Sequence, residues 1–263
     1  MFKLGDIIVD RIQMGVAESF NDELLYVLTQ LADGTIDVTA ESKDAVDATG
    51  TLVKRFWQGK TGTFSANNAM LNLNVLGSMS GETPEVASET NKIVMPRIIT
   101  VKAGTTVTLK NIVDGSIKVN ALSNNGAMGE SYVQAVAASA TEFGLAAGEN
   151  DGEFVFTPPT DADEAQFIVK YDREVSSGAA IRNKADKFPD TIRLTLKVLA
   201  VDPCSADTLR AGYVYMPSFQ PSPETSLSLT TDAQLEFKGD LQVDYCSADK
   251  SLYEFYWADE DEE

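Results

Sequence analysis

Two short segments with the same pattern hold the residues best suited to metal chemistry. Val201–Asp207 and Val243–Asp249 agree at six of seven positions, and each carries two aspartates and one cysteine. Carboxylates could hold a hard ion such as calcium, and thiolates would favour softer metals. The candidate ligands are Asp202, Cys204, Asp207, Asp244, Cys246 and Asp249.

The same segments are also typical of strand ends that enter turns. In that interpretation, the cysteine packs as a small apolar residue and a serine or aspartate caps the turn. The CxxC spacing of thiol-metal sites is absent from the sequence. We therefore favour turns, and we expect no metal and no cofactor.

The composition argues against most catalytic sites. The chain of 263 residues contains no histidine, which excludes Ser-His-Asp and Cys-His relays and histidine-bearing zinc sites. Gly59–Gly62 resembles the end of a phosphate-binding loop, but the upstream glycine is missing and a strand-like run follows. We expect no enzymatic activity and no catalytic residues. A hydrolase with two carboxylates stays open, because their separation cannot be read from a sequence.

Acidic residues dominate the charge balance. There are 40 Asp and Glu against 21 Lys and Arg, which gives a formal net charge of −19. Electrostatic binding of nucleic acid needs clustered cations, so this charge argues against it. Two cysteines are too few for a disulfide scaffold, and the sequence shows neither a secretory signal nor an apolar run of about 18 residues. We expect a soluble protein with reduced thiols, no membrane contact and a mobile acidic tail at residues 259–263.

One segment combines basic and aromatic side chains. It is Lys54–Lys60, and its candidate subunit-contact residues are Lys54, Arg55, Phe56, Trp57 and Lys60. As an ordinary strand, it would bury Phe56 or Trp57 and pair its cations with neighbouring acids. We favour a contact between subunits.

Period-two alternation of apolar and polar residues is the dominant pattern along the chain. It is clear in four runs, at residues 35–41, 166–171, 191–198 and 234–245. Alternation predicts strands with one buried and one wet face. Asp33-Gly34 and Asp114-Gly115 are typical of hairpin turns. The predicted fold is mainly β, an antiparallel sandwich-like or barrel-like core with one or two short helices and an inserted small β module.

A helix is predicted at residues 67–79, where apolar residues recur at helical spacing. Asn67 or Asn68 would cap its start, and Gly81 would end it. Residues 24–31 fit a second helix or a buried strand equally well. The expected domains are 1–92 as the first part of the core, 93–165 as an inserted β-rich module or long loops, 166–258 as the second part, and 259–263 as the tail.

Several blocks of sequence resemble structural proteins of tailed bacteriophages. They are residues 36–56, 59–73, 183–189 and 216–235. The order of strand, turn, strand and short helix near the N-terminus is similar to that of major tail tube proteins. The resemblance implies stacked rings, commonly hexameric, whose inner β-barrel passes DNA. An acidic lumen would let DNA slide, because it repels phosphates.

The predicted function is that of a phage tail tube subunit that self-assembles into a DNA-conducting channel. Its expected partners are further copies of itself, other virion proteins and passing DNA that is not bound by sequence. The expected location is the virion, after synthesis in the host bacterial cytoplasm. The alternatives are a capsid protein, a decoration protein or another virion component, and a carbohydrate- or host-binding β protein. The last of these would use Tyr213, Tyr215 and Phe219 on a loop platform.

Overall fold

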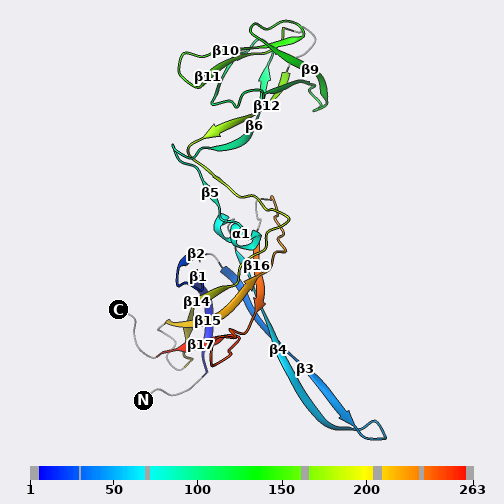
Figure 1. The fold of residues 1–263 in the computed structure, drawn as a ribbon, viewed down its shortest axis with the longest axis vertical. Coiled ribbons are helices and arrows are strands. Elements are labelled where there is room, and N and C mark those ends of the chain that lie inside the picture. The colour runs from blue at the N-terminus through cyan, green and yellow to red at the C-terminus, as the bar shows by residue number, and fades with distance from the viewer. Residues whose placement is uncertain are drawn as a thin grey trace. The chain divides into compact units, whose positions relative to one another are not determined.

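The computed structural model describes residues 6–29, 31–68, 72–160, 166–203, 209–230 and 234–258. The chain forms two compact units, drawn in Figure 1. The first unit combines Met1–Pro84 with Ile181–Glu263, and the second unit is Glu85–Ala180. The division of the chain expected at residues 93 and 165 stays a prediction.

The first unit is built on one antiparallel sheet of eight strands. Its order is β2-β1-β14-β15-β16-β4-β3, and β17 pairs with β15. The strands are β1 (Ile8–Glu18), β2 (Leu24–Leu28), β3 (Leu31–Val46), β4 (Leu52–Asn68), β14 (Ile192–Val201), β15 (Arg210–Pro221), β16 (Leu235–Leu241) and β17 (Glu254–Trp257). Because β1 also contacts β3, the sheet nearly closes into a barrel. The predicted β class with an antiparallel, barrel-like core is confirmed.

Alternation produces the core of the first unit. In β14, Ile192, Leu194 and Leu196 are buried, while the residues between them are partly exposed. Phe64, Phe219 and Phe237 are fully buried and meet with ring centroids 5.5–6.4 Å apart. Such side chains each stabilise the fold by roughly 1.5–3 kcal/mol through burial.

The predicted helix exists but starts later than expected. Helix α1 is Leu73–Ser80, and the Asn72 side chain caps it by accepting hydrogen bonds from the next turn. Asn67 and Asn68 instead belong to β4, where they pair with β16 and β3. The predicted start at residues 67 and 68 is therefore wrong, because pairing in the sheet continues through Asn68, and residues 69–71 lie outside the described residues. The predicted end is right, since Gly81 closes the helix with φ +67°.

Two sequence signals near the N-terminus, one ambiguous and one typical of a hairpin turn, have definite outcomes. Leu24–Leu28 is a strand. Asp33-Gly34 is not a hairpin turn, because it lies inside β3 at a bulge between Ala32 and Thr35. Asp33 has φ +53° there. A bulge, like a hairpin turn, uses a left-handed residue, so the dipeptide predicts the conformation correctly and the element wrongly.

The second unit has a sheet and a core of its own. The sheet order is β6-β12-β8-β9-β10-β11-β7, and a separate pair joins β5 to β13. The strands are β5 (Glu85–Val86), β6 (Ile93–Lys102), β7 (Val107–Lys110), β8 (Lys118–Leu122), β9 (Met128–Ala135), β10 (Glu142–Ala147), β11 (Glu153–Thr157), β12 (Gln166–Val175) and β13 (Ala179–Ala180). Asp114-Gly115 makes a turn with Gly115 at φ +70°, yet β7 and β8 do not pair, so it is not a hairpin.

Candidate functional site

The most unusual feature of the first unit is a long hairpin formed by β3 and β4. Every residue from Asp37 to Thr61 is exposed, and this stretch is called the arm below. In Figure 1 the arm extends well beyond the rest of the sheet that carries it. Burial begins at its base with Gly62 and Phe64. None of the first unit's residues that the structure describes therefore covers either face of the arm.

The arm is nevertheless a regular ladder with a defined tip. Thr39 pairs with Thr61, and their hydroxyls lie 2.9 Å apart. At the tip, Asp47 Oδ1 accepts hydrogen bonds from the backbone N–H of Thr49 at 2.8 Å and of Thr51 at 2.9 Å. A hydrogen bond from the Thr49 hydroxyl at 2.6 Å, together with these two backbone bonds, holds the pKa of Asp47 below its ordinary value. Gly50 supplies the left-handed turn residue at φ +86°.

One face of the arm continues the core-facing side of the sheet. Directly opposite residues share a face, and the register pairs Asp44 with Arg55 and Ser42 with Trp57. Arg55 Nε and Nη2 donate to the two carboxylate oxygens of Asp44 at 2.7 and 2.9 Å. The Arg55 guanidinium carbon also lies 5.8 Å from the centre of the Trp57 ring. The pairing lowers the pKa of Asp44 and raises the pKa of Arg55.

The opposite face carries a second cation-aromatic pair. Lys43 faces Phe56 across the ladder, and Lys54 faces Ala45. Lys54 Nζ lies 5.2 Å from the centre of the Phe56 ring. Each face of the arm thus presents one aromatic ring with a cation over it, a combination that suits protein contacts.

The predicted contact residues separate into two places. Lys54, Arg55, Phe56 and Trp57 lie together on the arm, and the two aromatic rings are 52% and 66% exposed. The alternative in which Phe56 or Trp57 is buried in this subunit is wrong, because both rings are exposed on the arm. Lys60 lies near the base and makes no ion pair within the described residues. Their role as a subunit contact stays a prediction.

A groove opens beside Lys60 at the base of the arm. It measures about 630 Å³ and is called the basal groove below. Its lining residues are Val38, Lys60, Val243, Lys250, Ser251, Leu252 and Tyr253. Sequence reasoning missed Lys250, because no local pattern shows that the loop before β17 lies against β4.

The two aspartate-cysteine segments do not form a visible metal site. Cys204 and Asp207 lie outside the described residues, and Cys246 is exposed and unbridged. Asp244 Oδ1 accepts a hydrogen bond from the Cys246 N–H at 2.9 Å, which makes the second segment a capped turn. Among the residues that the structure describes, no three Cys, Asp or Glu side chains could hold a metal together.

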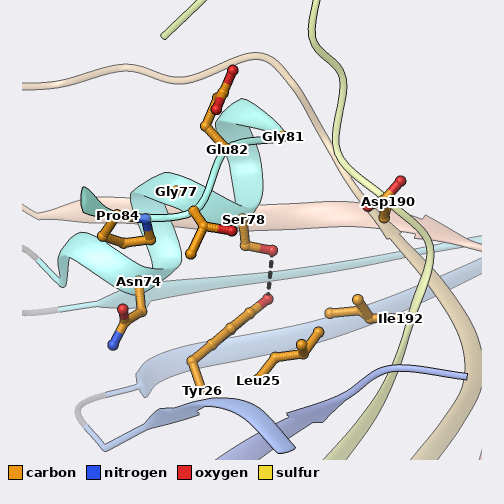
Figure 2. Close-up of a pocket in the computed structure, with 11 residues that line it drawn as sticks. Leu25, Tyr26, Asn74, Gly77, Ser78, Gly81, Glu82, Pro84, Asp190 and Ile192 are labelled. Carbon is orange, nitrogen blue, oxygen red and sulfur yellow. Dashed lines mark hydrogen bonds between the residues drawn. The ribbon is translucent and has the colours of Figure 1, made fainter. Parts of the chain in front are cut away.

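A smaller hollow of about 200 Å³ lies beside α1, as Figure 2 shows. The Tyr26 hydroxyl reaches into this region and lies 2.9 Å from the Ser78 hydroxyl. Burial raises the pKa of Tyr26 to about 12, and the Ser78 hydrogen bond offsets part of that effect. Glu82, on the rim, pairs with Lys184 at 2.7 Å. A tyrosine that stays protonated and a carboxylate that is already paired fit a structural role in this hollow better than a role in proton transfer.

The proposed aromatic platform for carbohydrate is wrong. Tyr213, Tyr215 and Phe219 lie in strand β15 rather than on a loop. Phe219 is fully buried in the core, and the two tyrosines are half-buried. A register shift between Met216 and Phe219 turns Phe219 into the core, away from the face that carries the two tyrosines.

A model of the YomU/Tube protein family matches residues 6–253. No curated protein matches the chain. No helix in the described part of the chain is long and apolar enough to cross a membrane.

Proposed function

We propose that the chain, which belongs to the YomU/Tube protein family of phage tube-like structural proteins, is a tail tube subunit that assembles into stacked rings. The match covers residues 6–253, which includes the whole arm, the second unit and most of the first unit. Membership in this family makes the chain a virion component. The finer role, a ring of copies around a channel for DNA, is our proposal.

The exposed arm carries this proposal. A two-stranded hairpin alone is marginally stable in water, and this one exposes Phe56 and Trp57 on opposite faces. Burial of such a ring in a contact contributes roughly 1.5–3 kcal/mol. An arm of this kind gains order and stability when a neighbouring subunit covers it. The arm would therefore be the surface through which one subunit holds the next in the assembly.

The charge suits a passage for DNA. A net charge of −19, repeated in every copy, gives the assembly a strongly negative surface. Such a surface repels phosphates and lets DNA pass without sequence-specific binding. The subunit would act without catalysis, would contact other virion proteins at the ends of the tube, and would be made in the host bacterial cytoplasm.

The decisive experiment compares assembly of the wild-type protein with that of a double variant, Phe56→Ala with Trp57→Ala. Electron microscopy and sedimentation should show rings or tubes for the wild type and dispersed subunits for the variant. Leu229→Ala is the matched control, because Leu229 is 87% exposed in the same unit but lies outside the arm. A wild-type protein that stays monomeric in every salt, or a double variant that assembles normally, would contradict the proposal.

A second role within the virion is favoured by one observation. The second unit has its own core, in which Phe143, Phe156 and Phe167 are fully buried. A compact unit of this kind would suit a capsid or decoration protein that displays a separate module. A reconstruction of the virion distinguishes the roles by the position of the subunit.

A further inference from the structure

We propose that the basal groove of one copy receives the tip of the arm of a second copy. The tip is defined as Val46, Asp47, Leu52 and Val53. This inference rests on the proposed function, because it names the surface that the arm contacts.

The basal groove arises where β3 and β4 leave the barrel. Val38 is paired with Gly62, and Ala40 with Lys60, so Lys60 shares the face that buries Phe64 further along. Leu241 packs against Gly62, where an added Cβ would lie 2.9 Å from its side chain. Beyond Leu241, the chain from Val243 to Tyr253 lines the other side.

The basal groove combines apolar walls with two lysines. Val243 and Tyr253 are 40% and 42% exposed. Lys60 and Lys250 make no ion pair with any residue in the described part of the chain. Lys250 Nζ lies 5.1 Å from the centre of the Tyr245 ring, which keeps it beside the groove. In a chain with a charge of −19, two lysines that form no ion pair with a described acid, placed at an apolar hollow, fit an acidic and apolar ligand.

The tip of the arm has that chemistry. Val46, Leu52 and Val53 are 59%, 50% and 68% exposed. Asp47 adds a carboxylate that the turn holds in its ionised form. The nearest other acid, Asp44, is already paired with Arg55. The tip therefore offers an apolar surface with one available negative charge.

The occupant has to come from a second copy. Strands rise about 3.3 Å per residue, so the nine steps from Thr51 to Lys60 place the tip roughly 30 Å from the groove of its own chain. A contact between two different surfaces is head-to-tail, and it generates closed rings or open stacks. Tip-in-groove contacts thus produce the kind of assembly proposed for this chain.

Charge reversal tests the contact. Lys60→Glu with Lys250→Glu should weaken association at least about tenfold, because it places two carboxylates against Asp47. Adding Ala48→Lys at the tip of the same chain should restore part of the association. Sedimentation at fixed protein and salt concentration measures both effects. A double variant that associates like the wild type would overturn the inference.

A cysteine pair gives an independent measurement. In a chain with Cys204→Ser and Cys246→Ser, Val53→Cys with Tyr253→Cys should form disulfide-linked oligomers on mild oxidation. Val53→Cys with Leu229→Cys is the control and should not. Tubes that form without this cross-linking would overturn the tip-in-groove contact and leave the tail tube proposal standing. Absence of both tubes and cross-links would overturn both.

Discussion

Arg55 forms a two-point salt bridge with Asp44 on an arm where every side chain is exposed. Exposed pairs of this kind add little to the stability of a monomer. The same guanidinium lies over the Trp57 ring. The pair therefore fixes the orientation of a ring that we expect to meet a neighbouring subunit.

The first prediction concerns Asp44→Asn. The thermal midpoint of the monomer should not change measurably, whereas assembly should require a higher protein concentration, because Arg55 loses its partner and Trp57 its fixed cation. Glu89→Gln is the control, since Glu89 is exposed and lies in the second unit. An equal effect of the two substitutions on assembly would contradict the role of the pair.

The pH dependence of this pair has a defined sign. The hydrogen bond from Arg55 lowers the pKa of Asp44 in the folded chain. The ion pair between Asp44 and Arg55 is therefore complete above the ordinary aspartate pKa, and it is lost as pH falls through the lowered value. Wild-type assembly should therefore weaken on acidification below the ordinary aspartate range. The Asp44→Asn variant should lose the part of this response that Asp44 causes.

The sequence predicts the strands well because alternation reports which side of a sheet is buried. In β14 the predicted inward residues, such as Leu194 and Leu196, are the buried ones. The start of α1 could not be predicted, since Asn68 and Asn72 are both good caps and sheet pairing decides between them. For the arm, the composition of Lys54–Lys60 is visible in the sequence. The exposure of the arm is not visible in the sequence, because apolar and polar residues alternate in an uncovered strand as they do in a covered one.

The basal groove could not be predicted at all. Its two cations, Lys60 and Lys250, are 190 residues apart in the sequence and meet through the loop that precedes β17. Lys60 belongs to the basic and aromatic segment Lys54–Lys60, but no pattern in the sequence points to Lys250. Sites assembled from distant loops need the tertiary structure, whereas single-segment features such as the arm residues do not.

The second prediction concerns Tyr26→Phe. The substitution removes the hydrogen bond to Ser78 and leaves that hydroxyl in a partly buried place. The free energy of unfolding should fall by about 1 kcal/mol, as measured by urea unfolding. Ser78→Ala made together with Tyr26→Phe should recover part of the loss, because it removes the unpaired partner. A single variant as stable as the wild type would show that the bond contributes nothing.

Tyr26 also predicts weaker stability at high pH. Its pKa is raised to about 12 in the folded chain, against an ordinary value of about 10. A raised pKa gives stability that is complete below the unfolded value and is lost as pH rises through the folded value. The total loss between about pH 10 and 12 is roughly 3 kcal/mol, and the Tyr26→Phe variant should lack this part of the alkaline transition.

The third prediction concerns the aromatic core. Phe219→Ala removes a fully buried ring that meets Phe64 and Phe237. The expected loss is about 3–5 kcal/mol of unfolding free energy, measured by denaturant unfolding. Phe20→Ala, at a position that is 44% exposed, is the matched control and should cost much less. Similar losses for the two variants would contradict the assigned core.

The last prediction concerns Gly81, which ends α1. Its φ of +67° is left-handed, and an added Cβ would meet the backbone of Phe188. Gly50→Ala is the matched control, since φ is +86° and no atom lies within 4 Å of the added Cβ. The control should cost about 1–2 kcal/mol at most, from the left-handed backbone alone. Gly81→Ala should cost clearly more, because the Phe188 backbone cannot move aside as a flexible side chain would. Thermal unfolding measures the destabilisation caused by each substitution. Equal shifts in the unfolding midpoint would show that the Phe188 backbone moves aside without loss of stability.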